Sequence, residues 1–332
     1  MKVAFFSTKS YDRESFENHL KDFGHEISFL EANLDLRTIS LAEGHRAICT
    51  FVNDTIDENI LRKMSKIGIE LIALRCAGYN QVDLKTAKSF GISVVRVPAY
   101  SPEAVAEHAF ALILTLSRKT HKAYNRVREN NFSLEGLTGV NIHGKTIGVI
   151  GTGAIGQAFC KIAKGFGCQI LAHDIQENQE MKNLGVEYLP LQEVLSRSHI
   201  ISLHCPLTPE TKHLINRETL SQMQNGVALI NTSRGALIDT KEVIQALKTK
   251  KLGFLGIDVY EQEEHIFFQN LSEEILLDEQ ITRLMTFPNV LITGHQAFLT
   301  KEALAQIALT TLKNLSEFEE GKPLTHEVKF TA

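Results

Sequence analysis

Three polar side chains stand shortly after three apolar runs in the second half of the chain: Arg234, Glu263 and His295. The three runs are residues 227–231, 255–259 and 290–293. An arginine can hold a small carboxylate through two parallel hydrogen bonds. A histidine can give or take a proton near neutral pH, and a carboxylate beside it can fix its tautomer and stabilise its protonated form. These residue types indicate acid–base chemistry on a small carboxylate-bearing molecule.

A glycine-rich loop lies upstream of these residues. Gly151-Thr152-Gly153-Ala154-Ile155-Gly156 follows the apolar run 146–150 and precedes a helical pattern over 159–167. A second β-like stretch, 168–173, is followed at once by Asp174. A strand, then G-x-G-x-x-G, then a helix, with an acidic residue roughly 20 positions on, is typical of a dinucleotide-binding motif.

Each position of this motif has a physical reason. Gly151 permits the tight turn, Gly153 lets the backbone approach a pyrophosphate, and Gly156 lets the helix pack closely on the sheet. The N–H groups of the first helical turn, including those of Ala154 and Ile155, suit phosphate oxygens. Asp174 can accept hydrogen bonds from ribose hydroxyls and repel a 2′-phosphate, which favours NAD over NADP. The alternative is a glycine-punctuated turn that binds no ligand.

Taken singly, the three polar residues have ordinary explanations. An arginine at a strand end is commonly in a salt bridge, an exposed glutamate is commonly solvated, and an isolated histidine is commonly structural. Their placement at strand ends beside a dinucleotide motif favours a catalytic role, because ligands of open α/β sheets bind outside the carboxyl ends of the strands.

The elements that must position these residues alternate between strands and helices. Apart from the motif itself, strands are expected at 2–6, 26–30, 47–52, 71–75, 92–97, 185–188, 199–204, 227–231, 255–259 and 290–293. Helices are expected at 13–23, 59–68, 103–130, 190–196, 217–222 and 241–248. This alternation predicts parallel sheets covered by helices, and 332 residues are enough for two domains. Residues 1–99 contain no glycine motif, so the second domain carries the nucleotide site.

One long helix is expected between the two domains. Ser101 can cap it, Pro102 fits its first position, and Glu103 suits its positive end. The pattern continues to Asn130, and its first half is apolar around most of the circumference. Such a helix is buried. Burial between subunits predicts a homo-oligomer, a homodimer or homotetramer, and burial inside one subunit is the alternative.

Composition and charge argue against several classes of protein. A net charge of −4 argues against a nucleic-acid-binding surface, and no apolar run reaches the roughly 18 residues of a membrane span. The N-terminal residues suit a first strand better than a signal peptide. Five scattered cysteines without a C-x-x-C indicate reduced thiols in the cytoplasm, with no disulfide framework and no metal site. Cys205 suits a small apolar filler near a ligand better than a nucleophile.

Seven stretches, in chain order, resemble the D-isomer-specific 2-hydroxyacid dehydrogenases, most closely the NAD-dependent D-lactate dehydrogenases among them. They are Arg75–Asn80, Tyr100–Pro102 with Ala106–His108, the glycine motif with Asp174, His204–Thr208, Asn231–Gly235, Asp258–Glu261 with Glu263, and Gly294–Phe298. The resemblance covers essentially the whole chain. It implies an α/β protein of two doubly wound parallel-sheet domains. A Rossmann NAD-binding domain, 100–297, is inserted into a flavodoxin-like catalytic domain, 1–99 plus 298–332, which the helix 301–321 completes.

The resemblance also assigns residues. Arg234, Glu263 and His295 are the expected catalytic residues. The substrate is expected to contact Arg234, the backbone of Ala77 and Gly78, and the rings of Tyr100 and Phe298. NAD is expected at Gly151, Gly153, Ala154, Ile155, Gly156, Asp174, His204, Cys205, Pro206, Thr232, Ser233, Arg234, Asp258 and His295. Asp258 is expected to support the catalytic network, and His108 is expected to be structural.

The implied activity is reversible hydride transfer between NADH and pyruvate, giving D-lactate, a reaction of fermentation. One alternative is another D-2-hydroxyacid dehydrogenase, acting on glyoxylate, hydroxypyruvate or a longer 2-oxo acid. The other is an NAD-sensing protein related to corepressors that share this fold. The segment 263–278 has no expected role beyond a surface excursion.

Overall fold

The computed structural model describes residues 1–330, apart from the side chain of His265. The chain forms two compact units. Unit 1 consists of Met1–Ser101 together with the chain from Phe298 onward, and unit 2 is Pro102–Ala297. Residues 331–332, the end of the expected catalytic domain, lie outside the described part.

Unit 1 is built on a five-stranded parallel sheet in the order β2-β1-β3-β4-β5. Its strands are β1 (Lys2–Phe5), β2 (Glu26–Phe29), β3 (Ala47–Thr50), β4 (Leu71–Leu74) and β5 (Ser93–Arg96). Its helices are α1 (Ser10–Leu20), α2 (Glu58–Lys66), α3 (Leu84–Ser89), α12 (Lys301–Glu319) and the 3₁₀ turn η1 (Ile39–Ala42). This strand order is the flavodoxin-like doubly wound order, as the resemblance implied.

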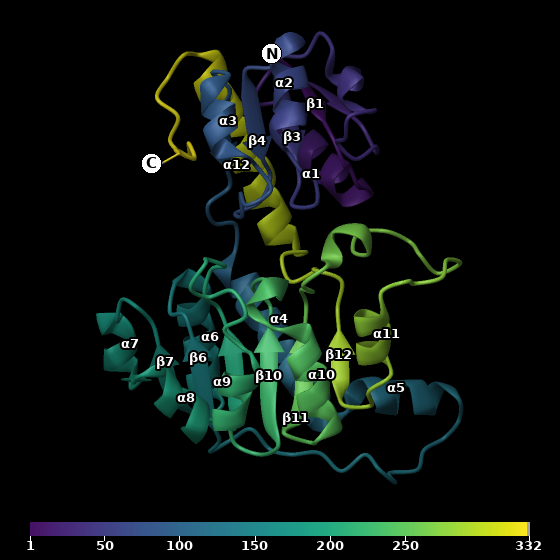
Figure 1. Ribbon diagram of the computed structural model, residues 1–332, viewed down its shortest axis with the longest axis vertical. Coiled ribbons are helices and arrows are strands. Elements are labelled where there is room, and N and C mark those ends of the chain that lie inside the picture. The colour runs from purple at the N-terminus through teal and green to yellow at the C-terminus, as the bar shows by residue number, and fades with distance from the viewer. Residues whose placement is uncertain (331–332) are drawn as a thin grey trace. The chain divides into compact units, whose positions relative to one another are not determined.

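The central strands of unit 1 are buried on both faces. Every residue of β3 and β4 is buried, which explains why they are continuous apolar runs rather than alternating ones. Helices α1 and α12 pack on one another on one side of the sheet, and α2 and α3 cover the other side (Figure 1).

Unit 2 is built on a seven-stranded parallel sheet in the order β12-β11-β10-β9-β6-β7-β8. Its strands are β6 (Thr146–Ile150), β7 (Gln169–His173), β8 (Glu187–Tyr188), β9 (Ile200–Leu203), β10 (Val227–Asn231), β11 (Leu252–Ile257) and β12 (Val290–Ile292). The order reverses between β6 and β9. This is the Rossmann arrangement, and the reversal is the point at which dinucleotides bind. The expected fold class is confirmed.

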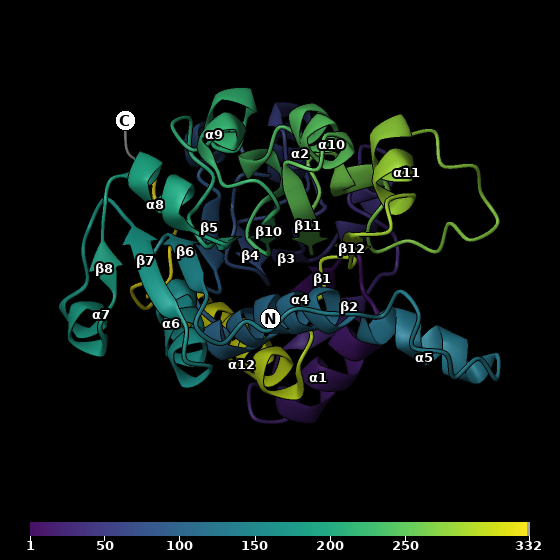
Figure 2. The same ribbon diagram turned by 90° about the horizontal axis from the view of Figure 1, so that it is seen from below.

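Helices cover both faces of this sheet, and a hydrophobic core lies under each layer. One layer contains α4 (Pro102–Arg118) and α6 (Ala154–Gly165), and the other contains α8 (Leu191–Arg197), α9 (Arg217–Gln222), α10 (Thr240–Lys248) and α11 (Glu279–Met285), as Figure 2 shows. The remaining helical elements are α5 (Thr120–Arg128), α7 (Gln179–Leu184), η2 (Gly235–Leu237) and η3 (Glu263–His265). Within residues 1–330, no helix combines the length and apolar character needed to cross a membrane.

The expectation of one helix over 103–130 is wrong. The chain forms α4, which ends at Arg118, and α5, which begins at Thr120. Lys119 between them adopts a left-handed conformation with φ 53°, which interrupts the helical hydrogen bonds. The carbonyl of Ser117 instead accepts from Val140 N at 3.0 Å. Helix α4 is buried against α6 and β11 of its own subunit, whereas α5 has no buried residue.

The segment 263–278 is only partly a surface excursion. Phe267 is buried, and the Tyr260 hydroxyl donates to the Asp278 carboxylate at 2.8 Å. Ile275 and Leu277 are exposed, at 85% and 87%. The short helices α3, α7 and α11 were not expected from the sequence.

Candidate active site

Three neighbouring strands of unit 2 carry the residues expected to be catalytic. β10, β11 and β12 are adjacent and parallel, so their carboxyl ends lie at one edge of the sheet. Arg234 follows β10, Glu263 follows β11 and His295 follows β12. The topology therefore delivers all three residues to the same edge.

His295 and Glu263 form a hydrogen-bonded pair. The distance between His295 Nδ1 and Glu263 Oε1 is 2.8 Å, and the two side chains are 15% and 19% exposed. The other oxygen of Glu263 accepts from Tyr260 N at 2.9 Å, which fixes the carboxylate. The ring of Phe268, which the sequence did not single out, lies 5.6 Å from the imidazole. With Nδ1 bound to Glu263, proton exchange with a substrate would use Nε2.

Arg234 is placed by the turn that follows β10. Asn231 Nδ2 donates to the carbonyl of Arg234 at 2.9 Å, and Asn231 Oδ1 accepts from Ser233 N at 3.0 Å. The half-buried guanidinium donates to Ser233 O at 2.7 Å. Within residues 1–330 no carboxylate pairs with this guanidinium. A half-buried cation without an acidic partner in the described part of its chain suits an anionic ligand.

The buried carboxylate of Asp258 anchors the loop that carries His295. It accepts from Gln296 N at 2.9 Å and from Ala297 N at 2.8 Å, and from the Thr293 hydroxyl at 2.5 Å. Burial raises the pKa of Asp258, but the hydrogen bonds from His108 and these donors outweigh it, so its pKa lies below the usual value. Asp258 is therefore a charged anchor for this loop.

His108 belongs to the same network. Its Nε2 lies 3.0 Å from Thr293 Oγ1 and 3.3 Å from Asp258 Oδ1. Because the Thr293 hydroxyl donates to Asp258, it accepts from the imidazole of His108. These contacts join α4 to the loop after β12, in keeping with the expected structural role of His108.

The glycine loop occupies the point at which the strand order reverses. Gly151 has φ +94°, and a Cβ there would lie 2.6 Å from Cys205 N, so the loops after β6 and β9 approach closely. A Cβ on Gly156 would lie 2.1 Å from Gly151 O. Nothing lies within 4 Å of a Cβ built on Gly153, which is the cap residue of α6. The N–H groups of Ala154 and Ile155 begin this helix beside the open position.

Asp174 directly follows β7 and is hydrogen-bonded to the glycine loop. Its Oδ2 accepts from Thr152 N at 2.5 Å and from Thr152 Oγ1 at 3.0 Å, and its Oδ1 accepts from Gln176 N at 3.0 Å. Partial burial raises the pKa of Asp174, but these hydrogen bonds lower it further, so the pKa is below its usual value. The Tyr188 hydroxyl donates to Thr152 Oγ1 at 2.9 Å. Thr152 and Tyr188 were not expected to take part.

The loops after β9 and β10 supply the remaining residues expected to bind NAD. The Ser233 hydroxyl donates to Cys205 O at 2.7 Å, which joins the two loops, and Pro206 next to it is exposed. Burial lowers the pKa of His204 to about 3, so this imidazole is neutral. Burial also disfavours the charged form of Cys205, and here it raises the pKa, to about 11. The thiol of Cys205 is therefore no nucleophile at neutral pH.

One orphaned polar atom tests whether the site fits a dinucleotide. The hydroxyl of Thr232 is buried and has no hydrogen-bond partner within residues 1–330. Buried hydroxyls without partners are costly, and a ligand amide or hydroxyl at the end of β10 would satisfy this one. The glycine loop, Asp174 and Thr232 together fit NAD.

Unit 1 places the other residues expected to bind substrate. Phe298 is buried, and its ring centroid lies 5.5 Å from that of Phe51, 6.4 Å from that of Tyr100 and 6.3 Å from that of Tyr11. Ala77 and Gly78 follow β4 in a half-buried loop. The rings of Tyr11 and Phe51 were not expected. Neither belongs to a motif, and only the tertiary packing reveals them.

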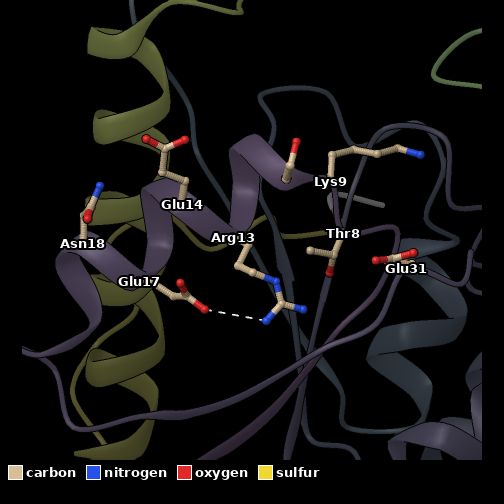
Figure 3. Close-up of a pocket in the computed structure, with 8 residues that line it drawn as sticks. Thr8, Lys9, Arg13, Glu14, Glu17, Asn18 and Glu31 are labelled. Atoms are coloured by element: carbon tan, nitrogen blue, oxygen red, sulfur yellow. Dashed lines mark ion pairs between the residues drawn. The ribbon is translucent and has the colours of Figure 1, made fainter.

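A separate hollow lies on unit 1 beside α1. Its volume is about 330 Å³, and none of the expected site residues lines it. Figure 3 shows the ion pair within it, between Arg13 and Glu17 at 3.6 Å. This surface hollow carries no part of the candidate site.

The fold of unit 2 and the side chains at its strand ends define a class of protein, an NAD-dependent oxidoreductase. The family model for the NAD binding domain of D-isomer specific 2-hydroxyacid dehydrogenases matches residues 110–297, more than half of the chain. The chain belongs to this family, and the resemblance seen in the sequence is confirmed.

Several known proteins are similar to this chain over nearly its whole length. The D-lactate dehydrogenase of Escherichia coli is 52% identical over 328 residues, which is 99% of this chain and 100% of that protein. The apo-structure of D-lactate dehydrogenase from Escherichia coli matches with a TM-score of 0.91 and 51% identity, over 99% of this chain and 100% of that one. D-lactate dehydrogenase from Aquifex aeolicus, complexed with NAD and lactic acid, matches with a TM-score of 0.87 and 35% identity, over 99% and 100%.

Proposed function

We propose that this NAD-dependent D-2-hydroxyacid dehydrogenase reduces pyruvate to D-lactate, reversibly, with NADH. The observation that carries the proposal is the His295–Glu263 pair at 2.8 Å. These residues follow β12 and β11, and β11 lies next to β10, the strand that presents Arg234. The similarity to D-lactate dehydrogenases over nearly the full chain supports the choice of substrate.

In the proposed reaction, Arg234 binds the substrate and His295 is the general acid. NADH, when bound, supplies the hydride that reduces C2 of the 2-oxo acid. Arg234 binds the carboxylate and polarises the 2-oxo group. His295 donates a proton from Nε2 to the oxygen that becomes the hydroxyl, and Glu263 stabilises the imidazolium before the transfer.

The proposal also assigns roles to the two units. Residues 100–297 form the NAD-binding domain, and residues 1–99 with 298–332 form the catalytic domain. In the latter, the backbone N–H groups of Ala77 and Gly78 bind the substrate carboxylate. Phe298 contacts the C3 group of the substrate, together with Tyr100 at the start of the NAD-binding domain. Aromatic walls favour a small substituent such as the methyl group of pyruvate.

A steady-state panel tests the substrate. Initial rates of NADH oxidation are measured with pyruvate, glyoxylate, hydroxypyruvate and 2-oxo acids of increasing length. We expect the largest kcat/KM with pyruvate and D-lactate as the product by chiral chromatography. A larger value for another 2-oxo acid would reassign the substrate within the family. Tight NADH binding without turnover of any member would favour an NAD-sensing role.

Asp174 is proposed to set the preference for NAD. Asp174→Ala removes the charge that opposes a 2′-phosphate, so we expect the ratio of kcat/KM for NADH to that for NADPH to fall by about tenfold or more. Asp239→Ala, which removes the cap of α10 in the same unit, is the control and should leave the ratio unchanged. An unchanged ratio in Asp174→Ala would contradict the assignment.

We propose further that the chain forms a homo-oligomer, a homodimer or homotetramer, through α5 and the segment 129–141. Helix α4 no longer supports this, because it is buried in its own subunit. Instead, α5 and the segment 129–141, together called the arm, carry exposed apolar side chains. These are Tyr124 at 62%, Val127 at 49%, Phe132 at 72%, Leu134 at 81% and Val140 at 49%. Such a concentration of exposed apolar residues is typical of an interface.

The expected result is loss of assembly when this arm becomes polar. Phe132→Glu with Leu134→Glu should convert the wild-type oligomer to a smaller species in light scattering, because charges would be buried in the interface. Glu135→Gln on the same segment should leave the mass unchanged. A monomeric wild-type protein at micromolar concentration would rule out the oligomer.

A cytoplasmic location is also part of the proposal. All five cysteines are free and buried, as is usual for proteins of a reducing compartment. Fractionation of cells that produce the chain tests this location.

A further inference from the structure

The loop after β4 has three carbonyl groups that accept hydrogen bonds. Val97 N donates to Cys76 O at 3.2 Å. Arg96 Nη1 donates to Ala77 O at 2.7 Å. The thiol of Cys76 donates to Gly78 O at 3.3 Å. Three consecutive carbonyls of this loop therefore have donors within unit 1.

Because the peptide unit is planar, these contacts also fix the direction in which the N–H groups of Ala77 and Gly78 point. In a planar trans peptide, the carbonyl and the N–H of the same unit point in opposite directions. Fixing Cys76 O therefore aims the N–H of Ala77 away from Val97, and fixing Ala77 O aims the N–H of Gly78 away from Arg96. Within residues 1–330 neither N–H has a hydrogen-bond acceptor, so both donors remain available to an anion.

Arg96 is the one charged member of this arrangement, and several contacts place it. It is the last residue of β5, and the register of β4 with β5 pairs it with Leu74, directly before the loop. Its own N–H donates to His326 O at 3.1 Å, and its carbonyl accepts from the buried Asn314 at 2.9 Å. The guanidinium lies 5.0 Å from the centre of the Tyr79 ring, which limits its movement.

We propose that Arg96 is a positioning residue for the substrate carboxylate: its guanidinium holds the Ala77–Gly78 peptide so that the N–H of Gly78 faces the anion. This inference rests on the proposed function, which assigns carboxylate binding to these N–H groups. The positive charge of Arg96 contributes to carboxylate binding as well as its position. A cation on the carbonyl oxygen polarises the peptide and strengthens its N–H as a donor.

The test compares Arg96→Met, Arg96→Lys and the wild type. Calorimetry measures the Kd of oxamate, an unreactive isostere of pyruvate, for each protein saturated with NADH, and steady-state rates give KM and kcat for pyruvate. For Arg96→Met we expect the Kd and the KM to rise about 10- to 100-fold, the range for loss of a charge-assisted hydrogen bond. The kcat should stay within about threefold, because carboxylate binding is common to ground and transition states.

Lysine provides the conservative rescue. Arg96→Lys keeps a charged donor that can reach Ala77 O, so its Kd and KM should rise by less than about fivefold. Arg46→Met is the matched control in the same unit. Arg46 also lies over an aromatic ring, Phe318 at 4.9 Å, and it pairs with Glu70 at 2.8 Å, but it contacts no backbone of the 76–78 loop. Its substitution should change neither constant.

The outcomes separate the inference from the function on which it rests. If the wild type reduces pyruvate and Arg96→Met binds oxamate as tightly as the wild type, the inference is wrong and the function stands. Equal weakening in Arg96→Met, Arg96→Lys and Arg46→Met would mean general disturbance of unit 1 and would also overturn it. If the wild type binds oxamate and only Arg96→Met weakens binding, but no 2-oxo acid is reduced, the inference stands and the function fails. A wild type that does not bind oxamate overturns both.

Discussion

His295→Gln should lower kcat for pyruvate reduction by about two to four orders of magnitude, the usual contribution of a general acid. The glutamine amide can still donate to Glu263 Oε1, which His295 Nδ1 contacts at 2.8 Å in the native protein, so the loop should keep its place. An amide cannot give up a proton at neutral pH. The alkoxide that forms at the substrate oxygen would then have to take its proton from water.

The measurement is kcat at saturating pyruvate and NADH, with the Kd of NADH from fluorescence titration. We expect the Kd to change little, because the glycine loop and Asp174 are untouched. The control is His213→Gln, since His213 also pairs with a glutamate, Glu261, at 2.5 Å in the same unit, but follows none of the three strands that present the proposed catalytic residues. The kcat of His213→Gln should be close to that of the wild type. Near-normal turnover in His295→Gln would remove this residue from the mechanism.

Arg234→Met should lower kcat/KM for pyruvate by about two to three orders of magnitude, the scale for removing one partner of a buried charge pair. Among residues 1–330 the guanidinium bonds only to Ser233 O, at 2.7 Å, and no acidic residue of this part of the chain would be left unpaired by its removal. The loss should therefore fall on the substrate and not on the stability of the unit.

Arg234→Lys distinguishes charge from geometry. Lysine keeps the positive charge but cannot present two parallel donors to a carboxylate, so it should recover only part of the loss. Arg197→Met is the control, because Arg197 pairs with Glu187 at 3.1 Å on the surface of the same unit and has no proposed role. A kcat/KM for Arg234→Met within about threefold of the wild-type value would exclude Arg234 from substrate binding.

Much of the fold follows from local sequence patterns. The expected strand 227–231 coincides with β10, and the expected helix 217–222 coincides with α9. Buried parallel strands are continuous apolar runs, which a single sequence displays plainly. The glycine loop could be located for the same reason: its turn, its close contact with Cys205 and its packing on the sheet all require glycine at particular spacings.

Other features depend on contacts between distant segments, and local patterns do not report them. The break at Lys119 is accompanied by a hydrogen bond from Val140 N to Ser117 O, between segments that lie apart in the chain. The aromatic contacts of Phe298 come from Tyr11, Phe51 and Tyr100, which lie far apart in the chain. No propensity or period encodes such partners.

The strand–helix alternation, the dinucleotide loop and the kinds of side chain available for chemistry can be inferred from the amino-acid sequence alone, because each depends on residues close together in the chain. The contact between Glu263 and His295 was an expectation that the three-dimensional structure had to supply, and the contact between Arg96 and Ala77 is visible in the structure alone. Both contacts arise because parallel pairing places strand ends side by side, and the order of strands in a sheet is a property of the whole packed domain.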